Sequence, residues 1–251
     1  LTLDTLREQA TAAGAKLLLV GDHQQLSAVD AGGAFGLLAV APGAHELRSL
    51  WRFTQRWEAY ATRRLRHGDP GVLAAYDHHE RITAGTSDEV LDAAYDAWAL
   101  DQTAGVSALL LAADTTTVDA LNDRAHQERV AAGAIDPASE VRAADGMQVG
   151  VGDVVLTRRN DRRLLTSAGQ HVRNGDRWTI STTHADGSVT ATRDQSHDPR
   201  LSGEEVLLPA AYVQDHVELG YATTVHRAQG VTVQRAHVLV TPGMSREALY
   251  V

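Results

Sequence analysis

Residues 219–233 hold side chains whose types and spacing suit the binding of a phosphate or a base edge. They read Leu-Gly-Tyr-Ala-Thr-Thr-Val-His-Arg-Ala-Gln-Gly-Val-Thr-Val. Thr224 can cap a short helical turn after a buried segment, and Gly230 can end that turn in a left-handed conformation. The free N–H groups of such a turn suit a phosphate, and His226 and Arg227 add polar contacts. Taken alone, the stretch is equally compatible with an ordinary surface turn.

A second candidate group follows the apolar run 16–20, which is typical of a buried parallel strand. The residues after it read Gly21-Asp22-His23-Gln24-Gln25-Leu26, at the strand end where open α/β sheets place their chemistry. Asp22 is either a carboxylate that binds Mg²⁺ or part of a nucleotide-sensing motif. The neutral amide of Gln25 can donate to a phosphate oxygen and accept from water, so it would suit the second interpretation, but residue chemistry alone leaves both open.

Lysine and cysteine usage exclude several kinds of site. The only lysine is Lys16, and no Gly-Lys-Ser/Thr sequence is present, so the usual phosphate-binding loop for ATP is absent from this chain. The absence of cysteine excludes disulfides, thiolate metal sites and thiol catalysis. The adjacent pair His78 and His79 does not share a helix face and has no third ligand at a suitable spacing, so no metal site is predicted.

The ends and the apolar content of the sequence indicate its setting. No membrane-spanning run and no signal peptide are present, which predicts a cytoplasmic protein. The 251 residues begin at Leu1 without an initiator methionine, so we expect a piece of a longer protein.

Charge is distributed unevenly along the sequence. The formal net charge of −9 argues against broad, nonspecific affinity for nucleic acid. Two spans, 48–66 and 157–177, are nevertheless rich in arginine. They hold Arg48, Arg52, Arg56, Arg63, Arg64 and Arg66 in the first span, and Arg158, Arg159, Arg162, Arg163, Arg173 and Arg177 in the second. Each span is either a local basic surface or a solvated face.

The order of predicted elements indicates an α/β fold with an inserted β-rich region. Helical patterns cover 2–14 and 55–102, the latter broken at 68–70, and a strand at 107–112 leads into a helix at 114–132. Short strands then alternate with turn residues. They are predicted at 148–156, 178–181, 188–193 and 205–208, before a buried strand at 236–241. Strands this short, joined by hairpin turns, predict a small barrel.

Several of these patterns occur together in one family. Residues 221–232 match Y-A-x-T-x-H-R-x-Q-G-x-T and resemble motif V of RecD-like superfamily 1 helicases, and G-D-x-x-Q-L at 21–26 resembles their motif III. Leu121-Asn122 matches a position in the second motor domain. G-D-V-V-x-x-x-x-N-D followed by V-x-N-G-D resembles the family's barrel insert. The ordered set is most similar to the helicase region of conjugative relaxases, the TraI, TrwC and TraA group.

This resemblance implies a domain organisation. Residues 1–50 would be the end of a first RecA-like domain, and 51–105 a helical connector. Residues 106–146 and 213–251 would form a second RecA-like parallel-sheet domain, interrupted by an SH3-like β-barrel at 147–212. The relaxase domain and the rest of the first motor domain would precede Leu1 in the parent chain.

The resemblance also implies roles for single residues. Gln25 would sense the γ-phosphate, and Arg52 would be an arginine finger, unless it is simply a solvated arginine at a helix start. The nucleotide would contact Gly21, Asp22, Gln25, Arg52, Gln229 and Gly230. Single-stranded DNA would contact Thr224, His226, Arg227, Arg159, Asn160 and Arg173.

The implied function is ATP-dependent 5′-to-3′ translocation on DNA, with ATP and Mg²⁺ bound by the intact protein. We expect this chain by itself to bind neither and to be inactive as an ATPase, because it lacks the phosphate-binding loop. Two alternatives stay open: a degenerate DNA-binding or scaffold module derived from a helicase, and an interaction domain whose arginines bind acidic protein surfaces.

Overall fold

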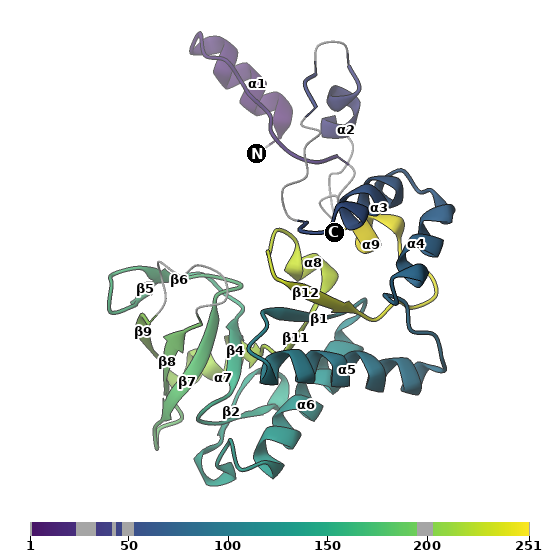
Figure 1. The fold of residues 1–251 in the computed structure, drawn as a ribbon. Helices are drawn as coiled ribbons and strands as arrows, with labels where there is room; N and C mark the ends of the chain where they lie inside the picture. Colours follow the sequence, from purple (N-terminus) through teal and green to yellow (C-terminus); the bar gives the residue numbers. More distant parts are fainter. Residues whose placement is uncertain (1, 24–33, 42–43, 47–52, 195–202, 251) are drawn as a thin grey trace. The chain divides into compact units, whose positions relative to one another are not determined.

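Figure 1 shows the fold in a computed structural model, which describes residues 2–23, 34–41, 44–46, 53–194 and 203–250. The chain divides into two compact units. One is formed by Leu1–Ile82 with Gly243–Val251, and the other by Thr83–Pro242. No helix in the described part of the chain has the length and apolar character that crossing a membrane requires.

The regular elements described in the first unit are all helices. Its elements are α1 (Leu3–Ala12), α2 (Ala34–Ala39), α3 (Arg56–Arg66), a 3-10 turn (Pro70–Val72), α4 (Leu73–His78) and α9 (Arg246–Tyr250). The predicted helix at 2–14 is confirmed: the Thr2 hydroxyl accepts the Thr5 N–H at its start, and Gly14 has φ +62° after its end. The predicted helix break at 68–70 is also confirmed, with Gly68 at φ +71°.

The predicted buried strand at 16–20 is wrong. Residues 15–22 form no strand, and Leu18 and Val20 are each 82% exposed. A strand needs a hydrogen-bonded neighbour, and the described residues of this unit contain no other strand that could supply one. An apolar run is therefore not sufficient to make a strand here.

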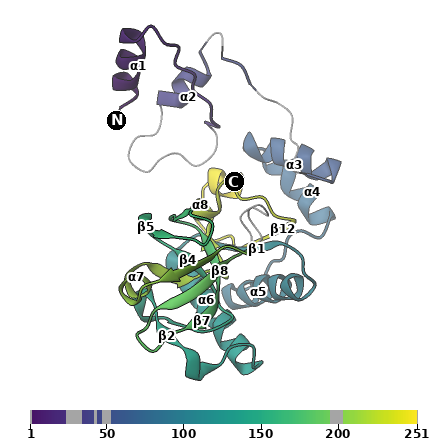
Figure 2. The same ribbon diagram turned by 90° about the vertical axis from the view of Figure 1, so that its left-hand side faces the viewer.

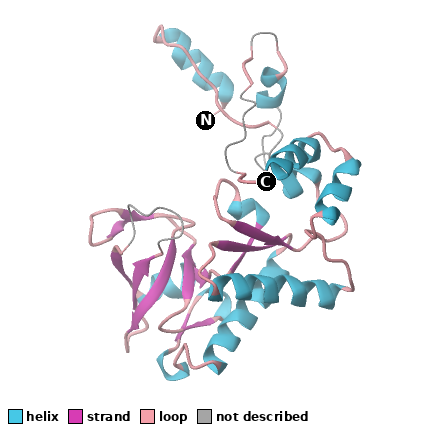
Figure 3. Cartoon of the chain, viewed as in Figure 1, coloured by secondary structure: helices cyan, strands magenta, loops and turns pink. Residues whose placement is uncertain are grey.

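The second unit contains a three-stranded parallel sheet in the order β11-β1-β12. Strands are magenta in Figure 3. Its strands are β1 (Ala108–Ala112), β11 (Ala222–Thr224) and β12 (Arg235–Val238). The central strand β1 is buried at every residue, as its apolar run predicts. Helix α5 (Ser87–Thr103) packs on β1 and β12, and helix α6 (Thr115–Ala131) packs on β1 and β11.

Side-chain caps begin both long helices, and α6 begins where the sequence predicts it. The Thr86 hydroxyl and the Glu89 side chain form a reciprocal capping box at the start of α5. The Asp114 side chain accepts the Thr117 N–H at the start of α6. The strand predicted at 236–241 exists in part as β12, but it is not buried, because Val238 is 38% exposed at the edge of the sheet.

Residues 141–219, here called the β-insert, lie between α6 and β11 in the sequence and form the β-rich region in Figure 2. Their main sheet is antiparallel, in the order β10-β4-β7-β8-β9. Its strands are β4 (Val154–Thr157), β7 (Arg177–Thr183), β8 (Val189–Arg193), β9 (Glu205–Leu208) and β10 (Val217–Leu219). Trp178 on β7 is fully buried in the core. The strands predicted at 178–181, 188–193 and 205–208 are confirmed as β7, β8 and β9.

Other parts of the β-insert differ from the prediction. The single strand predicted at 148–156 is two strands, β3 (Gln148–Val149) and β4, because Gly152 has φ +95° and turns the backbone between them. The elements not predicted are β2 (Val141–Arg142), β5 (Asp161–Leu165), β6 (His171–Val172), α7 (Ala210–His216) and β10. The division into domains inferred from sequence stays a prediction.

The chain leaves the β-insert through a tight passage at Gly220. The Gly220 N–H donates to the Val154 carbonyl at 2.8 Å. A Cβ atom on Gly220 would lie 3.0 Å from Leu156 Cγ and 3.2 Å from the Val155 carbonyl carbon. Glycine therefore allows the backbone to pass directly from β10 into β11 against strand β4.

Candidate nucleic-acid interface

In the segment 219–233, β11 runs directly into the short helix α8 (Val225–Ala228). The Thr224 hydroxyl accepts the Arg227 N–H at 3.4 Å, and Gly230 has φ +89°. Both the predicted cap and the predicted left-handed glycine are therefore confirmed. Thr224 is only 8% exposed, whereas the side chains of His226 and Arg227 reach solvent. Of these three residues, the titratable His226 and the cationic Arg227 are therefore the accessible ones.

One carboxylate connects this segment to the β-insert. Glu218 on β10 accepts a hydrogen bond from Nη1 of Arg227 at 3.1 Å, and its other oxygen lies 3.3 Å from Nε of Arg158. Burial lowers the pKa of the Arg158 guanidinium, and the Glu218 charge opposes that effect. Two guanidinium groups share a single carboxylate, so the junction keeps a net positive charge.

The three residues of the β-insert predicted to contact DNA lie close together. The Asn160 side-chain oxygen accepts the backbone N–H of Asn174, the residue after Arg173, at 2.9 Å. Arg159 is exposed, and its Nη1 lies 3.1 Å from Nε2 of His216. The Tyr212 hydroxyl donates to the Arg159 carbonyl at 2.5 Å. These bonds hold the loop after β4 beside the loop after β6, with Arg159 and Arg173 both exposed.

The rest of the arginine-rich span 157–177 is not a free basic surface. The Arg177 side chain is only 11% exposed and forms an ion pair with Asp194 at 2.7 Å, and Arg163 pairs with Asp161 at 3.0 Å. The Arg163 guanidinium and N–H lower the pKa of Asp161 to about 2. Side-chain pairing therefore removes much of the positive charge that the residue count suggests.

The predicted nucleotide contacts are only partly described. Gln25 and Arg52 lie outside the described residues. Asp22 is described, and its carboxylate is 3.1 Å from Nη2 of Arg66 on α3. Gly21 approaches the Phe35 ring so closely that a Cβ atom would lie 3.2 Å from it. The remaining predicted contacts, Gln229 and Gly230, are exposed in the other unit, after α8.

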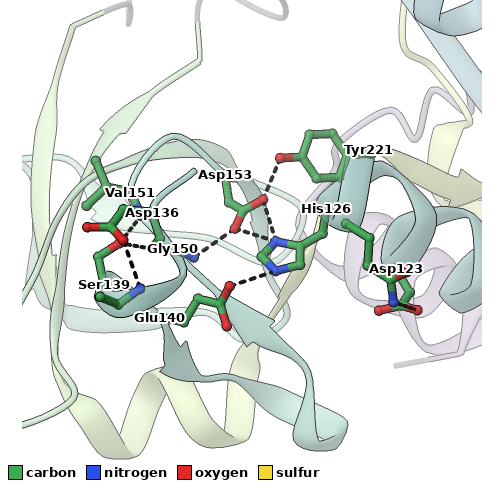
Figure 4. Close-up of polar contacts among 11 residues, drawn as sticks. Asp123, His126, Asp136, Ser139, Glu140, Gly150, Val151, Asp153 and Tyr221 are labelled. Atoms are coloured by element: carbon green, nitrogen blue, oxygen red, sulfur yellow. Dashed lines mark hydrogen bonds and ion pairs between the residues drawn. The ribbon is translucent and has the colours of Figure 1, made fainter. Parts of the chain in front are cut away.

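A buried polar network was not predicted from the sequence (Figure 4). Its centre is Asp153, which has no exposed surface. The Asp153 carboxylate accepts from the Tyr221 hydroxyl at 2.5 Å and from the Gly150 N–H at 2.7 Å, and it lies 2.9 Å from Nδ1 of His126. Since a carboxylate only accepts, the imidazole of His126 carries a proton on Nδ1. The second ring nitrogen lies 3.3 Å from Glu140.

Helix α6 supplies a second buried polar side chain one turn before His126. The Asn122 oxygen accepts the N–H groups of Tyr221 and Ala222, at 3.0 and 2.8 Å. Asn122 and His126 both interrupt an otherwise apolar buried face of α6. That interruption, at a spacing of four residues, is the signal in the sequence that could have revealed the network.

The network predicts a dependence of stability on alkaline pH. Burial and the Asp153 charge raise the pKa of Tyr221 above its usual value near 10. Above pH 10 the unfolded chain therefore loses this proton while the folded chain keeps it. The free energy of unfolding should then fall with pH, by up to about 1.4 kcal/mol per pH unit for one tyrosine. Urea unfolding at a series of alkaline pH values should show a shallower fall in Tyr221→Phe, and equal slopes would contradict the prediction.

Two domain families match parts of the chain. The AAA domain family matches residues 1–87, and the Rv2311 SH3-like barrel domain matches residues 141–218, which are nearly the whole β-insert. The sheets described above agree with the second match. The predicted fold class is confirmed. It is α/β, with a RecA-like parallel sheet, a helical segment and an inserted SH3-like β-barrel.

Relatives with longer sequences match almost the entire chain. A probable conjugal transfer protein TraA from Sinorhizobium fredii is 30% identical over 247 residues, 97% of this chain. Conjugal transfer protein TraA from Rhizobium radiobacter is 30% identical over 249 residues. In both cases the chain spans only 21% of the relative's length.

More limited similarities are also present. The uncharacterized protein Rv2311 of Mycobacterium tuberculosis is 34% identical over 85 residues, which cover 34% of this chain and 45% of that protein. The crystal structure of Pif1 helicase from Candida albicans covers 82% of this chain and 52% of its own, at 11% identity and a TM-score of 0.44.

Proposed function

We propose that this chain binds single-stranded DNA as part of an ATP-driven translocase. The TraA relatives confirm its predicted similarity to the helicase region of conjugative relaxases. The observation that carries the proposal is the ion-pair junction at Glu218. It links Arg227 after β11 to Arg158 at the end of β4, and so connects the two segments predicted to contact DNA.

A continuous series of contacts extends from this junction along the proposed DNA surface. Arg158 is followed by Arg159 and Asn160, and Asn160 holds the loop that contains Arg173. Exposed guanidinium groups suit the phosphate backbone, since their planar donor forks match phosphate oxygens. Contacts of this kind read no sequence, which suits a motor that must move along any DNA strand.

The nucleotide-dependent part of the function belongs to the longer protein. We propose that it binds ATP and Mg²⁺, with Gln25 and Arg52 contacting the γ-phosphate and Gly21, Asp22, Gln229 and Gly230 near the nucleotide. The described donors do not hold a nucleotide by themselves: Asp22 is ion-paired with Arg66, and the sequence has no Gly-Lys-Ser/Thr loop. This chain alone should therefore not hydrolyse ATP. The 5′-to-3′ direction follows from the family resemblance only.

The test of DNA binding uses two arginines on either side of the Glu218 junction. Arg173→Ala and Arg227→Ala should each weaken binding of a fluorescent oligothymidylate and reduce the slope of log affinity against log salt by about 0.7, the value for one single-strand phosphate contact. Fluorescence anisotropy at several salt concentrations measures both quantities.

A matched control removes an arginine far from these loops. Arg142 is exposed on β2, which lies well away from β5 and α8 in Figures 1 and 2. Arg142→Ala changes the net charge equally but should leave the salt slope unchanged. If all three substitutions lower the affinity to the same degree, binding reflects overall charge and the proposed surface is wrong. An affinity that does not depend on salt would favour a protein partner over DNA.

A further inference from the structure

We propose that Asn122, His126, Asp153 and Tyr221 form a positioning network that fixes the β-insert relative to the segment 219–233, so that both contact the same DNA strand. The inference rests on the proposed function, because it assumes that Arg173 and Arg227 bind DNA. It goes further by assigning a role to buried residues that touch neither DNA nor nucleotide.

Helix α6 is the common anchor of the network. Asn122 accepts both N–H groups at the start of β11, and so fixes the strand that leads to Arg227. One turn later, His126 binds Asp153, the residue directly before β4. The helix thus holds the backbone where each strand begins, through two side chains that lie on one face.

Tyr221 and Asp153 also bind each other directly. The Tyr221 hydroxyl donates to Asp153 Oδ1 at 2.5 Å and lies 3.4 Å from the Val154 N–H. Beyond this bond, β4 continues to Arg158 and β11 continues to Arg227, and these two arginines meet again at Glu218. The two DNA-contacting segments are therefore connected at both ends, by the buried network and by the ion-pair junction.

The buried connection should be the stiffer one. The Glu218 junction is partly exposed, with side chains 22–30% accessible, so water and salt weaken it. Asp153 is fully buried, and a buried carboxylate cannot move away from its donors without leaving an unpaired charge. The network consequently restrains the β-insert even when DNA displaces Glu218 from Arg227.

A rigid connection has a measurable consequence for binding. When two contact sites are held in register, the second contact adds affinity without a further loss of rotational and translational freedom. When the connection loosens, the two sites no longer meet the strand together. Removing one of them then costs less affinity than it does in the rigid protein.

The test is a double-mutant cycle on the full chain with a fluorescent oligothymidylate at low salt. Arg173→Ala should weaken binding about five- to tenfold in the unmodified chain, but less than about twofold in the presence of Tyr221→Phe. Tyr221→Phe keeps the ring and removes only the hydroxyl that bonds Asp153. Asp153→Asn provides a second background with the same expected loss of coupling, and circular dichroism confirms that each variant is folded.

The matched control is Tyr95→Phe. Tyr95 is also buried and its hydroxyl also bonds a carboxylate, Glu128 on α6 at 3.0 Å, but the polar and ring contacts of this pair are to Arg124 and Trp98, outside the β-insert and β11. Tyr95→Phe should lower the melting temperature without changing the effect of Arg173→Ala. If Arg173→Ala weakens DNA binding equally in the unmodified, Tyr221→Phe and Asp153→Asn backgrounds, the network has only a structural role. That result would overturn the inference but not the proposed function. Failure of the unmodified chain to bind DNA would overturn the proposed function and the inference with it.

Discussion

Replacement of Asp153 with alanine should lower the free energy of unfolding by about 3–5 kcal/mol, because it removes the buried carboxylate at the centre of the network. The substitution would leave the Tyr221 hydroxyl and the Gly150 N–H without their acceptor, and the His126 ring without its charged partner at Nδ1. Each buried donor left without a partner costs about 1–3 kcal/mol. Urea unfolding followed by circular dichroism measures the change.

Asp123→Ala on the same helix as His126 is the matched control. Asp123 is exposed, and its carboxylate accepts only from the Gln127 side chain, at 2.7 Å. Its removal should change stability little, since exposed side-chain pairs contribute little. A comparable loss in both variants would mean that the buried network of Asp153 has no special role in stability.

The second large effect concerns catalysis. If a longer protein binds ATP as proposed, Gln25→Ala and Arg52→Ala in that protein should each lower DNA-stimulated ATP hydrolysis by about a hundredfold or more. Contacts to the transferred phosphate act mainly in the transition state, so the affinity for single-stranded DNA should change far less. Steady-state ATPase assays and anisotropy titrations on the same preparations separate the two quantities.

Neighbouring residues of the same type serve as controls for the catalytic prediction. Gln24→Ala alters a variable position of G-D-x-x-Q-L, and Arg56→Ala removes an exposed arginine at the start of α3. Both variants should hydrolyse ATP at close to the unmodified rate. Unchanged ATP turnover in Gln25→Ala and Arg52→Ala would refute the assignment of these two residues to the γ-phosphate. This conclusion would not depend on the results for DNA binding.

Some features of the fold could be predicted because their signals are local. Thr224 and Asp114 start helices by accepting nearby N–H groups, and Gly230 adopts a conformation that suits few other residues. The short strands β7, β8 and β9 have turn residues on both sides. In each case the decisive interaction lies within a few residues along the chain, so the sequence pattern contains it.

Burial was predicted less well, because it depends on neighbours that a local pattern does not specify. The runs 16–20 and 236–241 are both apolar and both suggested buried strands. The first forms no strand, and the second is an edge strand with Val238 exposed. Likewise, the arginines at 157–177 suggested a basic surface, but Arg177 is mostly buried and paired with Asp194.

The sequence by itself determined the motif order, the β-rich insertion before residues 219–233, and the local conformation of that segment. Only the tertiary structure decided which parts of the chain meet. Asn122 binds Ala222 on β11, and His126 binds Asp153 just before β4, and both partners are distant in sequence. Such bonds form only after α6 packs on the sheet and excludes water, where a paired carboxylate is stable and an unpaired one is not. The segment 219–233 is therefore defined by its residues but positioned by the buried network beneath it.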